Sequence, residues 1–265
     1  MRYWLTINEP TVFVKRGYVA GSWPPCRKRA LLDGLRALRN LCRAHTAAYD
    51  VLHRLSKDCL VGFAHSAPHV VPCRPRHVMD RLAARLRNFV LNDCCFHLFG
   101  RRASRALDFI GINYYARELV RWRPSSGMPL VFGTECRADH HGRPRHFSSL
   151  GWEIYPTGLQ RVLTRFSRFG VPLLITENGI ATTNEEERSA YLSNHVRAVA
   201  AAISAGVDVR GYLYWTLFDN FEWAEGFNAK FGLASSERNT TQRDPRPAAR
   251  KLEAISRNNR CRLAD

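Results

Sequence analysis

The chain has 265 residues, of which 45% are hydrophobic and 24% are charged. This length and composition suit one large folded domain and exclude a disordered chain, a collagen-like repeat and a small disulfide-stabilised protein. No apolar stretch reaches the roughly 18 to 20 residues that span a bilayer. The formal net charge is +17, but the arginines are spread along the chain without a known nucleic-acid-binding motif. We therefore expect neither nucleic acid nor a membrane as a partner.

The cysteines form no CxxC pair and no Cys/His set with the spacing of a zinc site. There are eight of them, at positions 26, 42, 59, 73, 94, 95, 136 and 261. In a chain of this length they predict free thiols in a reducing compartment and no metal centre. The N-terminus does not have the shape of a signal peptide. The predicted location is the cytoplasm.

The first ten residues predict a strand that begins at once, because an apolar run of β-formers is ended by Asn8-Glu9-Pro10. A domain rarely begins with a buried strand, so we expect the chain to start in the middle of a larger fold. Four further strands are predicted, at residues 60–64, 107–115, 172–176 and 210–216. Helices are predicted at residues 30–56, 76–98, 157–168, 184–205 and 244–257. Residues 117–151 are predicted to be irregular.

Two of these helices carry more specific signals. In the first, leucines recur at helical spacing and predict one apolar stripe: Leu31, Leu32, Leu35, Leu38 and Leu41. At the start of helix 184–205, Thr183 and Glu186 fit a capping box, in which each side chain accepts a hydrogen bond from a free backbone N–H.

Strands alternate with helices, and no hairpin signal interrupts them, which predicts an α/β fold with a parallel sheet. The run at 172–176 is continuously apolar, as expected for a parallel strand covered on both faces. A doubly wound sheet and part of a TIM (β/α)8 barrel both satisfy this pattern. Barrel enzymes place catalytic groups at the C-terminal ends of several strands, so the strand ends become informative.

Two strands end in the same way. Glu9 follows the first strand beside Asn8, and Glu177 follows the fourth strand beside Asn178. In a barrel both carboxylates would point into the mouth, and two carboxylates flanking a sugar are the minimum equipment for glycoside hydrolysis. One carboxyl group donates a proton to the leaving oxygen, and the other attacks the anomeric carbon. On spacing alone, two solvated strand ends are an equally good interpretation.

An aromatic segment, Trp215 to Phe227, follows the fifth strand. Its rings offer flat apolar faces that suit a pyranose, and its carboxylates and indole N–H groups can bind hydroxyls. The alternative is an aromatic core or interface patch. Charged residues interleaved with the rings are unusual for a dry core, because buried charges need partners.

Five motifs together carry a family resemblance: TINEP, GINYY, GWEIYP, ITENG and YWTLFDNFEWAEGF. In this order they resemble glycoside hydrolase family 1, the retaining β-glucosidases. The resemblance runs from residue 3 to about residue 255 and implies strands 4 to 8 of the family's TIM barrel. Residues 1–265 would then form a single glycosidase-like barrel domain that lacks the first three βα units. Because five strands do not close such a barrel, we expect an open sheet that needs the missing N-terminal portion or self-association.

The resemblance implies roles for the residues of these motifs. Glu9 would be the general acid/base, and Glu177 would be the nucleophile that forms the glycosyl-enzyme. Asn8 would bind the sugar 2-hydroxyl, Asn113 would line the same pocket, and Tyr115 would orient the nucleophile. In retaining enzymes the two carboxyl groups lie about 5 to 5.5 Å apart.

The resemblance also implies a sugar-binding wall. Trp215 would stack under the sugar that is cleaved off, Glu222 and Trp223 would hold its outer hydroxyls, and Trp152 would line the leaving-group side. A carboxylate at position 222 would repel a phosphate, which favours a non-phosphorylated sugar. Glu153, inside GWEIYP, need not be catalytic.

The predicted function is that of a retaining β-glycosidase of the β-glucosidase type, which hydrolyses terminal non-phosphorylated β-D-glycosides by double displacement. The substrate is a small-molecule β-glycoside, and no cofactor is expected because the two carboxylates suffice. The alternative is an inactive truncated remnant, or a fragment that binds sugars without turnover.

Overall fold

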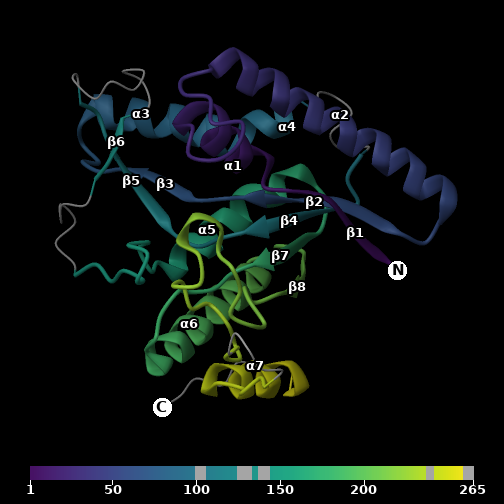
Figure 1. Cartoon of the computed structure of the whole chain (residues 1–265), viewed down its shortest axis with the longest axis vertical. Coiled ribbons are helices and arrows are strands. Elements are labelled where there is room, and N and C mark those ends of the chain that lie inside the picture. Colours follow the sequence, from purple (N-terminus) through teal and green to yellow (C-terminus); the bar gives the residue numbers. More distant parts are fainter. Residues whose placement is uncertain (99–105, 124–132, 137–143, 237–241, 259–265) are drawn as a thin grey trace.

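The computed structural model describes residues 1–98, 106–123, 133–136, 144–236 and 242–258. Its centre is a parallel sheet of five strands, in the order β1-β2-β4-β7-β8 (Figure 1). The strands are β1 (Tyr3–Asn8), β2 (Leu60–Ser66), β4 (Phe109–Asn113), β7 (Leu173–Glu177) and β8 (Val209–Tyr212). The predicted α/β class and all five predicted strands are confirmed.

The middle of the sheet forms the main core. Side chains of β2, β4 and β7, such as Phe63, Ile110 and Ile175, are almost fully buried and pack with Leu163 and Phe166. β7 lies between β4 and β8. The continuously apolar sequence of β7 therefore matches a central strand with covered faces.

Helices pack on this sheet and on a second, smaller sheet. They are α1 (Pro10–Val14), α2 (Leu31–Leu55), α3 (Val78–Asn88), α4 (Cys94–Leu98), α5 (Pro156–Phe166), α6 (Glu185–Ser204) and α7 (Pro247–Asn258). Shorter turns of helix are η1 (Lys15–Ala20), η2 (Phe89–Asp93), η4 (Ser167–Phe169) and η5 (Trp223–Glu225). The predicted helix 76–98 comprises α3, η2 and α4. No helix in the described ranges is long and apolar enough to cross a membrane.

A second sheet lies in a region that we predicted to be partly irregular. It contains β3 (His69–Pro72), β5 (Arg117–Arg121) and β6 (Thr134–Glu135), and β6 runs antiparallel to β5. A disulfide joins Cys73 to Cys136 at the end of this sheet. The prediction of free thiols is therefore wrong for these two cysteines. It is confirmed for the other five in the described residues, and Cys261 lies outside them.

The helix cap and the leucine stripe also differ from prediction. Asn184, not Thr183, caps α6, because its Oδ1 accepts hydrogen bonds from the backbone N–H of Glu186 at 2.9 Å and of Glu187 at 3.1 Å. In α2 the buried face is made by Gly34, Leu38, Cys42 and His45, while most of the predicted leucine stripe is exposed at Leu31, Leu32 and Leu35. This buried face of α2, which is narrower than the predicted leucine stripe, packs on β1 and β2.

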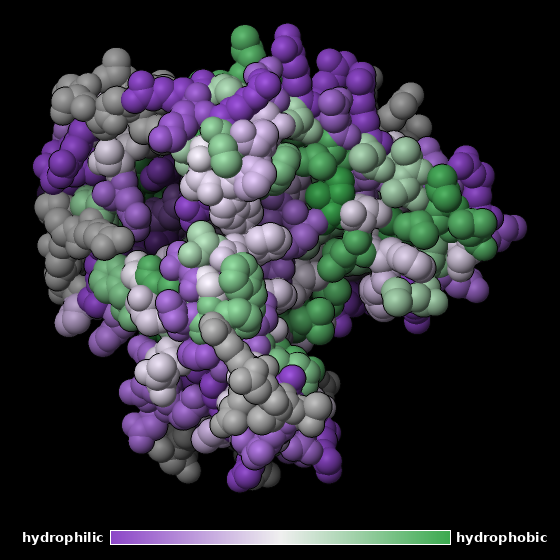
Figure 2. Space-filling model, in the orientation of Figure 1, coloured by the Kyte–Doolittle hydropathy of each residue, from purple (hydrophilic) through white to green (hydrophobic). Residues whose placement is uncertain are grey.

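The two outer strands of the large sheet, β1 and β8, do not pair with each other within the described residues. β1 is 46% exposed at Tyr3, 37% at Trp4 and 45% at Leu5, and Leu213 just after β8 is 53% exposed. Figure 2 shows hydrophobic surface on the side of the molecule that carries β1. The expected open sheet with apolar edges is present in the described part of the chain.

Candidate active site

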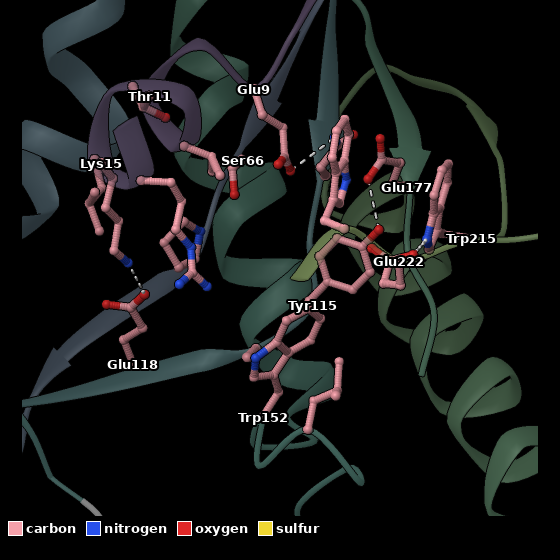
Figure 3. Close-up of a pocket in the computed structure, with 18 of the residues that line it drawn as sticks. Glu9, Thr11, Lys15, Ser66, Tyr115, Glu118, Trp152, Glu177, Trp215 and Glu222 are labelled. Atoms are coloured by element: carbon pink, nitrogen blue, oxygen red, sulfur yellow. Dashed lines mark hydrogen bonds and ion pairs between the residues drawn. The ribbon is translucent and has the colours of Figure 1, made fainter. Parts of the chain in front are cut away.

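A pocket of about 420 Å³ lies at the C-terminal ends of the large sheet's strands (Figure 3). All nine side chains that the sequence analysis selected line this pocket: Asn8, Glu9, Asn113, Tyr115, Trp152, Glu177, Trp215, Glu222 and Trp223. They come from segments up to 215 positions apart (8 to 223), and the parallel arrangement brings them together because it places the carboxyl ends of all strands at one edge.

Glu9 occupies the turn between β1 and α1. Its backbone is in the left-handed region, with φ 46° and ψ 57°, which a non-glycine residue rarely adopts. Its N–H donates to the Ala64 carbonyl of β2 at 2.8 Å, and its carbonyl accepts from the Val12 N–H at 3.0 Å. These bonds hold a conformation of the kind that is concentrated at functional sites.

The surroundings of Glu9 favour its protonated form. Burial, followed by the charge of Glu177, raises the pKa of Glu9 to about 7. Hydrogen bonds from Asn113, whose Nδ2 lies 3.1 Å from Oε1, and from Ser66 oppose this rise. A carboxylic acid with a pKa near neutrality is suited to donate a proton at physiological pH.

Glu177 ends β7 on the other side of the pocket. The Tyr115 hydroxyl donates to its Oε2 at 2.7 Å. Burial, with a smaller contribution from the charge of Glu222, raises the pKa of Glu177 above its ordinary value, and hydrogen bonds from Tyr115, Asn8 and Asn113 offset only part of this rise. These donors point at an ionised carboxylate, the form that a nucleophile needs.

The two residues after Glu177 have structural tasks. Asn178 is fully buried, and its Nδ2 donates to the Tyr114 carbonyl at 2.7 Å and to the Tyr191 hydroxyl at 2.9 Å. At Gly179 a Cβ atom would lie 1.8 Å from the Trp215 carbonyl oxygen, so only glycine permits this approach. Gly179 therefore lets the chain after β7 approach the aromatic segment, and Asn178 joins it to α6 and to the residue after β4.

The aromatic segment forms one wall of the pocket. The Trp215 indole N–H donates to Glu222 Oε2 at 3.3 Å. The Trp152 ring packs at a tilt against the rings of Tyr115 and Phe231, with centroids 5.2 and 6.1 Å apart. Rings next to hydrogen-bonding carboxylates suit a sugar, which has apolar C–H faces and polar hydroxyls.

Trp223 lies at the mouth of the pocket. It is 65% exposed, and its ring centroid lies 5.2 Å from that of Trp23. Sequence reasoning did not select Trp23, which follows α1 and η1 in a loop without a strand pattern.

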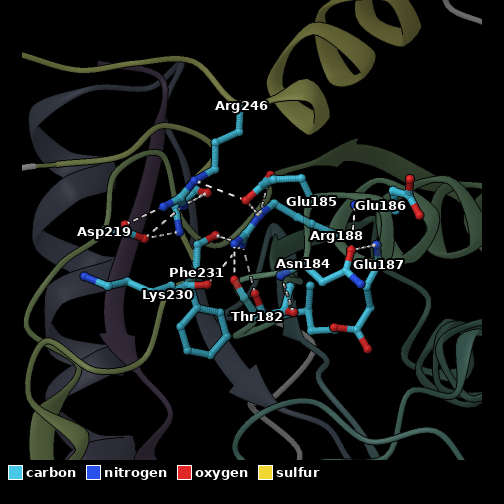
Figure 4. Close-up of polar contacts among 12 residues, drawn as sticks. Thr182, Asn184, Glu185, Glu186, Glu187, Arg188, Asp219, Lys230, Phe231 and Arg246 are labelled. Atoms are coloured by element: carbon cyan, nitrogen blue, oxygen red, sulfur yellow. Dashed lines mark hydrogen bonds and ion pairs between the residues drawn. The ribbon is translucent and has the colours of Figure 1, made fainter.

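A buried arginine holds this wall in place (Figure 4). Arg188 of α6 is fully buried, and its Nη1 donates to the carbonyls of Ile180, Lys230 and Phe231 at 3.2, 3.1 and 3.0 Å. Its Nε contacts Glu185 at 3.2 Å. Arg188 thus joins the loop after β7 to the end of the aromatic segment.

Arg246 extends this network. It contacts Glu185 at 3.3 Å and donates to Asp219 Oδ2 at 2.8 Å. Asp219 in turn accepts from the Gly232 N–H at 2.8 Å. The loop that carries Glu222 is therefore held at both ends by charged hydrogen bonds, the stronger kind in proteins.

Two polar groups near the site escaped the sequence analysis or received no role there. Ser66 lines the pocket at the end of β2, and its position just after a predicted strand was the available signal. Glu153 binds Arg117 and Arg145 at one side of the pocket. Burial would raise the pKa of Glu153, but hydrogen bonds from the two guanidinium groups hold it below its ordinary value. Glu153 is thus an ion-paired residue.

Within the described ranges, no three His, Cys, Asp or Glu side chains gather in a way that could hold a metal ion.

Comparison with known families decides the lineage. A model of "Glycosyl hydrolase family 1" matches residues 1–101 and 100–261. The chain belongs to this family. It is 38% identical to the rice protein "Beta-glucosidase-like SFR2, chloroplastic", over 93% of this chain and 37% of that protein. It is 34% identical to the β-galactosidase of Sulfolobus acidocaldarius, over 96% of this chain and 54% of that protein.

The solved structures of this glycosyl hydrolase family agree. A β-glucosidase from Thermotoga maritima in complex with glucoimidazole superposes with a TM-score of 0.84 at 27% identity, over 97% of this chain and 63% of that one. Such neighbours are TIM barrels of family 1. The chain thus spans between 37% and 63% of the lengths of these three proteins.

Proposed function

We propose that this family 1 chain carries the catalytic machinery of a retaining β-glycosidase, which acts on terminal, non-phosphorylated β-D-glycosides. The observation that supports it most is the pair of strand-end carboxyl groups in one pocket. Glu9 has a pKa of about 7, raised by burial and by the nearby Glu177, whereas Glu177 receives the Tyr115 hydroxyl at 2.7 Å. Two carboxyl groups held in different environments suit an acid and a nucleophile.

In the first step, the Glu177 carboxylate attacks the anomeric carbon while Glu9 gives its proton to the leaving oxygen. The glycosidic C–O bond breaks, and a covalent glycosyl-enzyme forms on Glu177. In the second step, Glu9 accepts a proton from water, the water oxygen attacks the anomeric carbon, and the bond to Glu177 breaks. Two inversions leave the product with the β configuration of the substrate.

The walls of the pocket support the substrate class. Trp215 offers a stacking face, and Glu222 beside it can accept hydrogen bonds from sugar hydroxyls. A phosphate at this position would face the Glu222 carboxylate and be repelled. Glucosides and galactosides both remain within this class.

The experiment is covalent trapping with 2,4-dinitrophenyl 2-deoxy-2-fluoro-β-glucoside and its galactoside counterpart. We expect a mass increase of one fluorosugar on the peptide that contains Glu177, and none in Glu177→Ala. The first product formed from an unsubstituted aryl glycoside, observed by proton NMR, should be the β-anomer. A first product with the α configuration would refute the retaining mechanism.

The open sheet favours a second candidate, a fragment that binds sugars without turnover. The edge strands β1 and β8 do not pair with each other, so the described sheet is not closed. The chain also spans only 37% of the length of its rice relative. Calorimetry with glucoimidazole distinguishes the two functions. Binding without trapping or hydrolysis supports the fragment, whereas binding with trapping supports the enzyme.

We further propose that the chain is one barrel domain without its first three βα units, and that its edges are covered in the working protein. Exposed Trp4 and Leu5 on β1 and exposed Leu213 after β8 support this proposal. Uncovered edges of this kind favour association. Sedimentation velocity of the 265-residue chain should therefore show oligomers. A well-behaved active monomer would contradict the proposal.

Location in the cytoplasm stays a proposal. It is supported by the five free cysteines, whereas the Cys73–Cys136 disulfide argues for an oxidising compartment. Fractionation of cells that express the natural gene, followed by thiol labelling of the protein, would decide between the two.

A further inference from the structure

A buried threonine contacts the amide that lies beside both carboxyl groups. Thr176 of β7 donates its hydroxyl hydrogen to Asn113 Oδ1, with the oxygens 2.6 Å apart. The other end of the same amide, Nδ2, donates to Glu9 Oε1 at 3.1 Å and to Asn8 Oδ1 at 3.0 Å. Thr176 and Asn113 are 7% and 1% exposed, so water does not readily replace these bonds.

The direction of this chain of hydrogen bonds follows from the groups involved. The Asn8 amide oxygen and an ionised Glu9 carboxylate only accept, so in this state the NH2 end of Asn113 faces both. With Glu9 ionised, a reversed amide would place Oδ1 against two acceptors. Thr176 favours the observed orientation because its hydroxyl group holds Oδ1 on the opposite side.

The sheet provides a specific place for Thr176. Ile112 pairs with Ile175 and Asn113 pairs with Glu177, so Thr176 is an extra residue in β7 at this point. Irregularities of this kind are enriched next to active sites, where they redirect a side chain. On the neighbouring strand, a Cβ atom at Gly111 would lie 2.9 Å from the Thr176 hydroxyl oxygen, so the glycine leaves room for it.

We infer that Thr176 is a positioning residue, whose hydroxyl holds the Asn113 amide so that its nitrogen faces the acid/base Glu9. This inference rests on the proposed function, since it deepens the description of the same site. It concerns a residue that does not line the pocket and that touches the substrate in no step of the reaction.

The consequence is electrostatic. Hydrogen bonds from Asn113 lower the pKa of Glu9 and of Glu177, in both cases against the effect of burial. The other ionisable groups that face the pair are Glu222, after β8, and the Tyr115 hydroxyl, after β4. Neither contacts Thr176, so its removal should act on the two carboxyl groups through Asn113 alone.

The test measures both carboxyl groups directly, without activity. The protein is labelled with [δ-¹³C]glutamate, and the signals of Glu9 and Glu177 are assigned with Glu9→Gln and Glu177→Gln. We expect Thr176→Val to raise the Glu9 titration midpoint by about half a pH unit or more, the size of one lost hydrogen bond. Thr176→Ser keeps the hydroxyl and should leave the midpoint unchanged.

Two further variants make the result specific. Thr11→Val makes the same substitution at a buried threonine of the same pocket and should not move the midpoint. Asn113→Ala should raise it, and adding Thr176→Val to Asn113→Ala should raise it no further, because the two residues act in series. If Thr176→Val does not fold, Thr176→Ala compared with Thr176→Ser replaces it.

The inference is overturned if Thr176→Val leaves the midpoint in place, or if Thr176→Ser raises it as much as valine does. It is also overturned if the effects of Thr176→Val and Asn113→Ala add. A failure of fluorosugar trapping would refute the proposed function and leave these midpoints, and therefore this inference, standing.

Discussion

The two carboxyl groups of the site lie at the ends of strands with different positions in the sheet. Glu177 ends β7, a central strand that pairs with β4 and β8, and the residues around it are buried. Glu9 directly follows β1, an edge strand that pairs only with β2 in the described sheet and is exposed at Tyr3 and Leu5. The Glu177 side of the pocket is thus built into the core, whereas the Glu9 side depends on the edge.

This difference shows that one pocket can be built from a central strand on one side and from an edge strand on the other. β7 pairs with a strand on each side, while the outer edge of β1 has no strand partner among the described residues. We therefore expect changes near β7 to alter stability and chemistry together, and changes on β1 to act mainly on assembly.

The largest expected effect separates the chemical roles of the two halves. Glu177→Ala should abolish turnover with every leaving group, because no glycosyl-enzyme can form. Glu9→Ala should lower kcat/KM by about 10²- to 10⁴-fold for a poor leaving group, and far less for dinitrophenolate, which needs no proton. Steady-state kinetics with both substrates measures this, and exposed Glu186→Ala is the control. Equal losses for both leaving groups in Glu9→Ala would contradict its role as acid.

Arg188→Ala tests the core-supported half. The substitution removes the guanidinium group that donates to the carbonyls of Ile180, Lys230 and Phe231 and leaves Glu185 without one of its ion-pair partners. We expect the free energy of unfolding to fall by about 3 to 5 kcal/mol, as measured by urea denaturation. Arg197→Ala, on the exposed face of the same helix, should change it by less than about 0.5 kcal/mol. Similar losses in the two variants would show that the network does not stabilise the fold.

The pH profile tests the edge-supported half. Glu9 must carry a proton to act as an acid, and its protonated fraction falls as the pH rises through its pKa of about 7. The value of kcat/KM should therefore fall above pH 7, approaching tenfold per pH unit. Burial of Glu9 and the charge of Glu177 set the pH at which this fall begins. A profile that stays flat to pH 9 would exclude Glu9 as the titrating acid.

The smallest expected effect on stability concerns the edge itself. Leu5→Lys places a charge on exposed β1 and should shift sedimentation toward the monomer, since edge lysines discourage pairing. The free energy of unfolding of the monomer should change by less than about 0.5 kcal/mol. Val78→Lys, on exposed α3, serves as the control and should not alter association. Unchanged oligomers in Leu5→Lys would place the association surface elsewhere.

Much of the fold could be read from the sequence, because it depends on local patterns. The apolar run of β7 and the alternation of strands and helices predict a parallel sheet, and the observed strand bounds differ from prediction by a few residues. The short strands β5 and β6 were missed because their polar sequences carry no such pattern. Asn184 replaced Thr183 as the cap, since both residue types can cap and the choice depends on the local backbone.

The sequence by itself determined which groups the site contains and on which strand ends they stand, because parallel strands bring all their carboxyl ends to one edge. Only the tertiary structure decided how these groups act on one another. Asn113 and Glu9 are 104 positions apart, and the Cys73–Cys136 bond closes 63 positions. Burial, hydrogen-bond direction and the resulting pKa values depend on such distant neighbours, which no local pattern specifies.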